Sequence, residues 1–316
     1  MKIGLIDVDG HHFPNLALMR ISAYHKAHGD DVDWWLGDLW HYDIVYMSKI
    51  FSDAYSPDVW EPINADKVIK GGTGYSIKLD ENGKEYFDKE AHQNLPTEVE
   101  SMFPDYSIYP QFDFAVAMTS RGCPRNCPFC HVSQKEQRAS IKVANVSDFW
   151  NGQKHIEVLD PNITACRDKH ELFEQYAETG ATVCFNQGLD IRMITDRDIE
   201  DLNKIRLKKV HFAWDNPNDD LKGRFAEYAK GARWKPHGKF GTVYCLTNFE
   251  DVSVSEHIDK ALMRIYCLRD MGFDPYVMIY NKPSAPMEVR LLQRWCNNKI
   301  VFGKIPNFKD YDRRRA

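Results

Sequence analysis

Short apolar runs alternate along the chain with longer amphipathic stretches. Residues 2–8 (KIGLIDV) are apolar and rich in β-branched side chains, which is typical of a buried strand. Residues 15–29 carry apolar side chains near helical spacing and end on a glycine, a natural C-terminal stop for a helix. Because strands and helices take turns in this way, the pattern predicts an α/β fold with mostly parallel sheets.

Residues 1–75 are predicted to form a small doubly wound α/β domain of the flavodoxin-like kind. Its four expected strands are the runs KIGLIDV, DVDWW, YDIVYMS and DKVIKGG. Residues 76–109 are polar and rich in turn formers, and we expect an ordered linker whose tyrosines and phenylalanines pack on the flanking domains.

In residues 110–305, predicted strands and helices alternate regularly. Six strand-like runs are followed by helical or loop segments: FDFAVAMTS, HIEVLDP, ATVCFNQ, LKKVHFAWD, GTVYCLTN and DPYVMIYN. This pattern fits a partial (β/α)6 TIM-like barrel better than a closed eight-fold barrel, which usually needs about 250 residues. In such folds the active site lies at the carboxyl ends of the strands. Residues 306–316 are expected to form a basic, solvated tail.

Composition narrows the class of protein. The chain has 316 residues, of which 43% are hydrophobic, so it is long enough for two domains with their own cores. The net charge of −5 gives no specific signal for nucleic acid. No apolar run approaches the length of a membrane span, and the first residues lack the layout of a secretory signal. The eight cysteines are too sparse for a disulfide scaffold, so we expect a cytoplasmic protein.

Three of the cysteines stand in one short stretch, RGCPRNCPFCHV, directly after the first predicted barrel strand. Cys123, Cys127 and Cys130 can hold a cubane iron–sulfur cluster by three irons and leave the fourth iron open. A structural zinc site needs a fourth Cys or His, and His131 is a poor candidate because neighbouring side chains tend to point apart. From the residues alone, zinc with a distant fourth ligand and three unrelated cysteines remain the alternatives.

The Cys-x3-Cys-x2-Cys spacing resembles the signature of the radical S-adenosylmethionine (SAM) superfamily, including the aromatic Phe129 before the last cysteine. The resemblance covers roughly residues 112–302 and implies a partial barrel. It also implies that the three thiolates bind a [4Fe-4S] cluster whose open iron is chelated by SAM. Reductive cleavage of SAM would then give a 5′-deoxyadenosyl radical that abstracts hydrogen from a substrate. An electron donor such as flavodoxin or ferredoxin is the implied partner.

The first domain resembles the cobalamin-binding domain that precedes many radical SAM barrels. Asp9 and His11 fit the start of the D-x-H-x-x-G pattern that supplies an axial histidine, but Pro14 stands in place of the glycine. The domain also lacks a fifth strand. We therefore expect it to bind cobalamin weakly or not at all, and to cap the barrel mouth and admit the substrate.

Polar residues at the predicted strand ends are the candidates for binding SAM. With the motif residue Phe129, they are Asp160, Asn162, Gln187, Gly188, Arg192, Thr247 and Asn248. Seven further strand-end residues are weaker candidates: Asn186, Asp190, Trp214, Asp215, Tyr280, Asn281 and Lys282. Arg192 is expected to pair with the SAM carboxylate through two parallel hydrogen bonds. The alternative for each of these residues is a helix cap or an ordinary loop position. The glycine-glycine-glutamate pattern of the family is not evident, since VLDPN stands there.

The remaining five cysteines are widely spaced. Cys184 and Cys245 fall in predicted strands, and Cys267 and Cys296 in predicted helices, where a thiol acts as a small hydrophobe. Cys166 lies in a polar loop and is the candidate for a reactive thiol.

The sequence thus predicts a radical SAM enzyme that acts on an unknown substrate. One alternative is a cobalamin-dependent radical SAM methyltransferase. Another is a non-catalytic iron–sulfur or zinc-binding protein, which six strand–helix units with polar strand ends disfavour.

Overall fold

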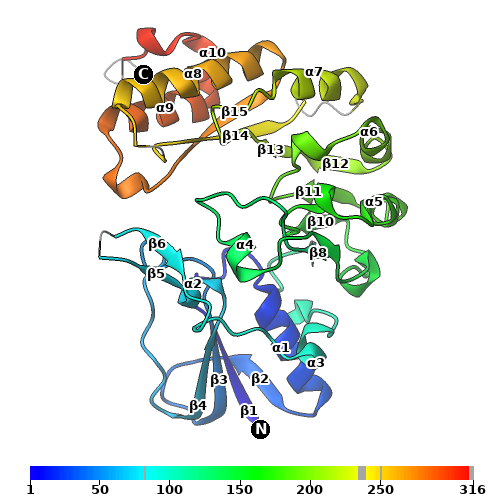
Figure 1. Cartoon of the computed structure of the whole chain (residues 1–316). Coiled ribbons are helices and arrows are strands. Elements are labelled where there is room, and N and C mark those ends of the chain that lie inside the picture. The colour runs from blue at the N-terminus through cyan, green and yellow to red at the C-terminus, as the bar shows by residue number, and fades with distance from the viewer. Residues whose placement is uncertain (82, 234–239, 250, 313–316) are drawn as a thin grey trace. The chain divides into compact units, whose positions relative to one another are not determined.

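The computed structural model describes residues 1–316 except 82, 234–239, 250 and 313–316, so the end of the basic tail lies outside the described residues (Figure 1). Two compact units are present. The first unit contains Met1–Ala117, Gly122–Arg138 and Ala144–Gln153, and the second contains Met118–Arg121, Ala139–Val143 and Lys154–Ala316.

The first unit is built on a parallel sheet with the order β2-β1-β3-β4. Its strands are β1 (Lys2–Asp7), β2 (Asp31–Trp34), β3 (Tyr42–Ser48) and β4 (Ala65–Gly71). All four predicted strands are therefore present. The helix α1 (Leu16–Ala27) starts at Asn15, whose side-chain oxygen accepts from the amides of Ala17 and Leu18. This cap satisfies two of the amides that the first helical turn leaves without partners.

A doubly wound sheet has helices on both faces, but in this unit a helix covers only one face of the sheet. Helix α1 packs on the face that carries Ile3 and Leu5. Residues 35–41 and 49–64, all described, connect the later strands without a helix. These segments are rich in Asp, Ser, Pro and Gly, which favour turns. The second face buries Val45 and Met47 beneath Trp35 and Tyr75 instead.

The predicted linker contains short elements of its own. They are the antiparallel pair β5 (Ile77–Leu79) and β6 (Glu85–Phe87), α3 (Thr97–Glu100) and the 3₁₀ helix η1 (Tyr106–Ile108), and the short helix α2 (Thr73–Ser76) ends where the predicted linker begins. Val99, Leu95 and Ile108 pack against the core beneath α1. The linker therefore adds to the core of the first unit.

Two groups of parallel strands form the second unit. In one, β10 (His155–Val158), β11 (Thr182–Phe185) and β12 (Arg206–Lys209) are neighbours in that order. In the other, the order is β13 (His211–Ala213), β14 (Thr242–Thr247) and β15 (Asp274–Ile279). The helices are α5 (Lys169–Glu178), α6 (Asp196–Leu202), α7 (Lys222–Gly231), α8 (Val254–Asp270), α9 (Met287–Asn297) and α10 (Lys299–Lys304). No helix among the described residues is long and apolar enough to cross a membrane.

The run LKKVHFAWD, predicted as one strand, is two strands in different sheets. It breaks at Val210, and the register between β11 and β12 shifts at Val183/Cys184. After the break, β13 pairs with β14. An isolated bridge between Phe212 and Leu189 connects β13 to the segment that follows β11. These strands thus fall into two sheets, β12-β11-β10-β7, in which β7 is Ala115–Ala117, and β13-β14-β15. The expected six-stranded partial barrel is not confirmed, and no closed barrel forms among the described residues.

One face of these sheets is packed against helices. Phe185 of β11 contacts Phe173 and Tyr176 of α5 through edge-to-face ring pairs. Phe212 of β13 meets Tyr228 of α7 in the same way, with ring centroids 4.8 Å apart. Figure 1 shows α5, α6 and α7 along one side of their strands. Because successive side chains of a strand point to opposite faces, the residues between these positions face away from the helices.

Arg264 of α8 ties the ends of two strands together. Its side chain is buried, with 1% exposed. The guanidinium donates to the carbonyl oxygens of Trp214 (2.6 Å), Asp215 (2.9 Å) and Leu246 (2.9 Å). It therefore fixes the carboxyl ends of β13 and β14, where candidate site residues lie.

Replacing Arg264 with Met keeps most of its volume but leaves these buried carbonyls without donors. We expect the free energy of unfolding to fall by about 3 kcal/mol, measured by urea denaturation followed by circular dichroism. The matched control is Arg197→Ala on α6, whose side chain is 70% exposed and whose loss should cost less than about 0.5 kcal/mol. Equal effects of the two substitutions would contradict the role given to Arg264.

Candidate functional site

The cysteine loop begins at Gly122, directly after the short strand β8 (Ser120–Arg121). Gly122 has a positive φ of 88°, which favours glycine, and its amide donates to Glu136 (2.5 Å). The amide of Cys123 donates to the carbonyl of Gln137, and that of Cys130 to the carbonyl of Cys127. The backbone thus closes the loop on itself, and all three cysteines are partly exposed.

The three thiols of the loop are a donor set that suits an iron–sulfur cluster. A cubane binds each thiolate to a different iron, so three thiolates hold it and leave the fourth iron open. A structural zinc ion needs a fourth Cys or His ligand as well.

His131 follows the last cysteine and caps α4 (Val132–Lys135). Its Nε2 lies 3.7 Å from a carboxylate oxygen of Glu85, and its ring lies 6.3 Å from that of Phe87. This places the imidazole against β6 and agrees with the view that it is a poor fourth ligand. Phe129, the aromatic residue of the motif, is half-buried in the same loop.

Asp160, a candidate SAM residue, has a structural task in the second unit. Its carboxylate accepts from the amide and hydroxyl of Thr119 (2.7 and 2.8 Å) and from the amide and hydroxyl of Ser120 (2.6 and 2.7 Å). Burial raises the pKa of the Asp160 carboxyl to about 6, although these four donors act to lower it. Asp160 thereby anchors the backbone that leads into the cysteine loop.

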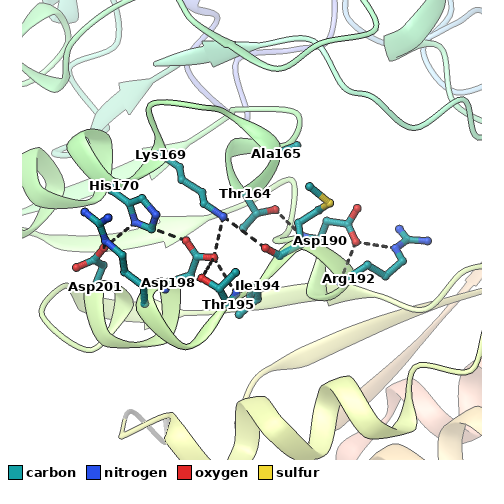
Figure 2. A network of polar contacts seen from close by, with 12 residues as sticks. Thr164, Ala165, Lys169, His170, Asp190, Arg192, Ile194, Thr195, Asp198 and Asp201 are labelled. Carbon is teal, nitrogen blue, oxygen red and sulfur yellow. Dashed lines mark hydrogen bonds and ion pairs between the residues drawn. The ribbon is translucent and has the colours of Figure 1, made fainter.

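A chain of hydrogen bonds joins the residues after β10 to those after β11 (Figure 2). Asn162 accepts from the hydroxyl of Thr164 (2.8 Å), and that hydroxyl accepts from the amide of Asp190 (3.0 Å). Asp190 in turn binds Nε of Arg192 (2.6 Å), and Arg192 also binds Asp219 (3.0 Å). The structure therefore brings Asn162, Asp190 and Arg192 together.

Arg192 already faces two carboxylates. Burial acts to lower its pKa, but Asp190 and Asp219 outweigh this and raise it. The guanidinium is thus a fixed cation in an ion-pair network. A SAM carboxylate would have to compete with Asp219 for it, so the expected bidentate contact stays a prediction.

A second network stabilises the same loop from the helix side. In Figure 2, Lys169 of α5 lies beside Asp198 of α6, with a distance of 2.7 Å between Nζ and the carboxylate. Asp198 is fully buried and also accepts from Thr195, the cap of α6. His170 completes the group through Asp201 (2.9 Å). These contacts belong to helix capping and hold the loop that carries Arg192.

Gln187 and Gly188 follow β11. Gln187 is exposed, and Gly188 has a positive φ of 87° where it approaches the backbone of His211. Asn186, just before them, donates to Glu157 (2.7 Å). Gln187 is therefore accessible for a ligand, whereas Asn186 is held in place.

Asp215 and Trp214 follow β13. Trp214 is buried and stacks on Phe225, so it belongs to the core. Asp215 accepts from the amide of Leu246 (3.2 Å). Burial raises the pKa of Asp215 to about 6, and the positive charge of Arg264 acts to lower it.

Thr247 and Asn248 end β14. The hydroxyl of Thr247 is buried and has no hydrogen-bond partner among the described residues. Asn248 has a φ of 63°, a strained conformation for a residue other than glycine, and donates to the carbonyl of Tyr280 (3.0 Å). A buried hydroxyl without a partner beside a strained backbone is the kind of feature that a bound ligand explains. Asn281 and Lys282 are exposed at the end of β15, where Asn281 caps a 3₁₀ turn.

The scattered cysteines behave as predicted, with one exception. Cys184, Cys245 and Cys296 are buried, and burial raises the pKa of each thiol to about 12. Cys267 is partly buried in α8. Cys166, the candidate for a reactive thiol, is only 2% exposed, and burial raises its pKa as well. Since the thiolate is the reactive form, both features disfavour that role.

The loop after β1, which carries Asp9 and His11, makes contacts within the first unit. Asp9 accepts from the amide of Ile50 (2.5 Å), and the ring of His11 packs edge-on against Trp34, with centroids 4.3 Å apart. His11 has a φ of 62°. No hydrogen bond between Asp9 and His11 is present in the described part of the chain.

Backbone atoms of the protein lie directly against the glycines that follow β4. A Cβ added to Gly72 would overlap the carbonyl oxygen of Lys49, and one added to Gly74 would overlap that of Phe51. The side chain of Lys49 is fully buried there, forms an ion pair with Asp53 and lies over the ring of Tyr75. The backbone and Lys49 therefore fill the space beside these two glycines.

Several polar residues on the strands themselves were not identified from the sequence. Glu157, His155 and Tyr244 lie within β10 and β14 and face away from the helices. The candidates from the sequence all lie at strand ends. These positions could have been recognised in the sequence, because polar side chains stand there at every second position of otherwise apolar strands.

Comparison with known proteins shows similarity in fold but not in sequence. The sequence matches no known family and no curated protein. The fold is similar to that of the radical S-adenosylmethionine methyltransferase TsrM from Kitasatospora setae, solved with cobalamin and a [4Fe-4S] cluster bound. The TM-score is 0.61 at 10% identity, over 88% of this chain and 74% of the other. The two chains share a mixed α/β fold with parallel sheets.

Asp160→Asn tests the anchor before the cysteine loop. The amide group of Asn places donors against the donors of Thr119 and Ser120, so we expect the free energy of unfolding to fall by about 3 kcal/mol. Urea denaturation at pH 7 measures it. Glu200→Gln on the exposed side of α6 is the control and should change stability by less than about 0.5 kcal/mol. An Asp160→Asn protein as stable as the control would show that the four hydrogen bonds do not matter.

Asp215 predicts a pH dependence. Its pKa is raised on folding, so the stability it contributes is present at low pH and is lost as the pH rises through about 6. The difference in unfolding free energy between wild type and Asp215→Asn should therefore shift by about 2 kcal/mol, against the wild type, from pH 4.5 to 7.5. Parallel stability curves for the two proteins across this range would contradict the assignment.

Proposed function

We propose that the protein is a radical SAM enzyme. The observation that carries the proposal is the three-cysteine loop, with its Cys-x3-Cys-x2-Cys spacing, in a chain that shares its fold with a radical SAM methyltransferase. Cys123, Cys127 and Cys130 would hold a [4Fe-4S] cluster. This group would supply the electron that cleaves SAM to methionine and a 5′-deoxyadenosyl radical. An electron donor such as flavodoxin or ferredoxin is part of the proposal.

The residues of this chain would position SAM and exclude water. Gln187 is exposed at the end of β11, and Thr247 offers a buried hydroxyl at the end of β14. Both can exchange hydrogen bonds with the ribose or adenine of SAM. Arg264 would act as a positioning residue, because it fixes the two strand ends beside Asp215 and Thr247.

The test is anaerobic reconstitution with iron and sulfide. We expect about four irons and four sulfides per chain, by the stoichiometry of a cubane, and slow formation of 5′-deoxyadenosine from SAM after reduction with dithionite. Replacing Cys123, Cys127 and Cys130 together with Ala should abolish both. The matched control is Cys267→Ala, which removes a partly buried thiol outside the loop and should keep both. Stoichiometric zinc with no bound iron would refute the proposal and favour the non-catalytic metal-binding alternative.

A cobalamin-dependent methyltransferase is the second candidate. It is favoured by the fold neighbour, which has cobalamin bound. It is disfavoured by the space beside Gly72 and Gly74, which Lys49 and the backbone of Phe51 fill. We expect no shift in the absorption spectrum of hydroxocobalamin on addition of the protein, even at 100 µM of each, roughly the range of a weak site. Copurification of about one cobalamin per chain would instead favour the cobalamin-dependent methyltransferase over an enzyme that uses SAM alone.

A further inference from the structure

The sheet of the first unit carries connecting loops on the face opposite α1. Residues 35–41 and 49–64 connect its strands without a helix. Lys2 stands one position before a residue that packs against α1, so its side chain belongs to the opposite face. The ammonium of Lys2 lies over the rings of Trp40 (4.7 Å) and Tyr42 (5.1 Å). The first connecting loop therefore lies on the face that α1 leaves open.

The two loops are joined to each other at Asp38. Its carboxylate accepts from the amides of Ile63 (3.0 Å) and Asn64 (3.2 Å), and the side-chain amide of Asn64 donates to the carbonyl of Asp38 (3.2 Å). Leu39 follows Asp38 directly and so lies close to Ile63. Trp60 stands three residues before Ile63, which is no more than about 11 Å along an extended chain. The apolar side chains of the two loops therefore belong to one surface.

Large apolar side chains of these loops project into solvent. Five of them form what we call the apolar patch: Leu36 (64% exposed), Leu39 (91%), Trp40 (55%), Trp60 (93%) and Ile63 (87%). At roughly 150 Å² for each, the low end of the range for large side chains, the patch measures about 750 Å². The largest apolar patch of a typical monomer measures about 300–600 Å². The patch is therefore larger than a chain that acts alone normally exposes.

Acidic side chains beside the patch have partners in the same unit. Lys70 of β4 lies 2.9 Å from a carboxylate oxygen of Glu61 and 3.4 Å from one of Asp58. His41 lies 3.3 Å from a carboxylate oxygen of Asp66. Because these carboxylates are balanced locally, a second copy of the same surface can approach without a strong repulsion between like charges. Nucleic acid or anionic lipid would instead meet carboxylates at the edge of the patch.

We propose that the apolar patch is the interface of a two-fold symmetric homodimer. In such an interface the same surface of both copies is used, so the patch of one copy packs against the patch of the other. Its area is close to the roughly 800 Å² that each partner contributes to a standard interface. Tryptophan is enriched and charged residues are depleted at the centre of interfaces, which fits Trp40 and Trp60. The second copy supplies the layer that helices supply in a doubly wound sheet. The proposal concerns the first unit and does not depend on the iron–sulfur cluster.

Sedimentation equilibrium of the full chain tests the proposal. The buffer contains a thiol reductant, so that no disulfide between copies contributes. At about 50 µM, above the roughly micromolar dissociation constant of a weak interface of this size, we expect about twice the chain mass of 36.8 kDa. A wild-type protein that keeps the mass of one chain at this concentration would overturn the proposal.

Ile63→Asp should weaken dimerisation at least about tenfold, because the two-fold axis places two carboxylates in the apolar interface. Trp60→Asp is a second variant with the same expected result. Both side chains are exposed, so the fold should be kept, which circular dichroism checks. The matched control is Ile300→Asp in α10 of the second unit, where the side chain is 71% exposed, and it should remain as dimeric as the wild type. If both patch variants dimerise as tightly as this control, the patch is not the interface.

A lipid surface is the other occupant that the test separates. Flotation with phosphatidylcholine vesicles measures it on the same proteins, and we expect the wild type to stay in the protein fraction. A monomeric wild type that floats with the vesicles, together with an Ile63→Asp protein that does not, would assign the patch to a membrane and overturn the dimer.

Discussion

A buried carboxylate holds the backbone that leads into the cysteine loop. Asp160 stands at the end of β10 and accepts four hydrogen bonds from Thr119 and Ser120, which lie 40 or 41 positions earlier in the chain. Its burial would be costly without these donors, and the donors would lack partners without it. The hydroxyl of Tyr176, 3.2 Å from that of Thr119, brings helix α5 into the same arrangement. The backbone of Thr119 and Ser120, just before the cysteine loop, is therefore held by contacts within the second unit.

The local elements could be predicted because their signals are local. The apolar runs that became β1, β3, β11 and β14 are continuous, and the helices between them begin at capping residues such as Thr195 and Ser253. The break at Val210 could not be predicted, since LKKVHFAWD is an unbroken strand by composition. Which sheet each half joins is decided by partners far away in sequence, Cys184 for one half and Thr242 for the other.

In the candidate site, too, features that depend on local sequence could be predicted, whereas features that depend on distant partners could not. The three cysteines are found by spacing alone, because one short loop carries them all. Arg192 was chosen for its geometry toward a carboxylate, but the carboxylate that it meets is Asp219, 27 residues onward. Asp160 and Cys166 were chosen as polar or reactive groups near a strand end, and both are buried. A sequence shows which residues have suitable chemistry, whereas burial and long-range partners decide which of them are already committed to the fold.

The two units use their buried polar groups differently. In the first, Lys49 and the backbone beside Gly72 and Gly74 fill the space after the strands, and the lysine is neutralised by Asp53. In the second, Glu157 and Asn186 lie on a sheet face without helices, beside rings that burial keeps neutral. The first arrangement is complete without a ligand. In the second arrangement, Asn186 donates to one carboxylate oxygen of Glu157 (2.7 Å) and His155 contacts the other. A shielded carboxylate is stable only with donors close by, and in this unit neighbouring strand residues supply them.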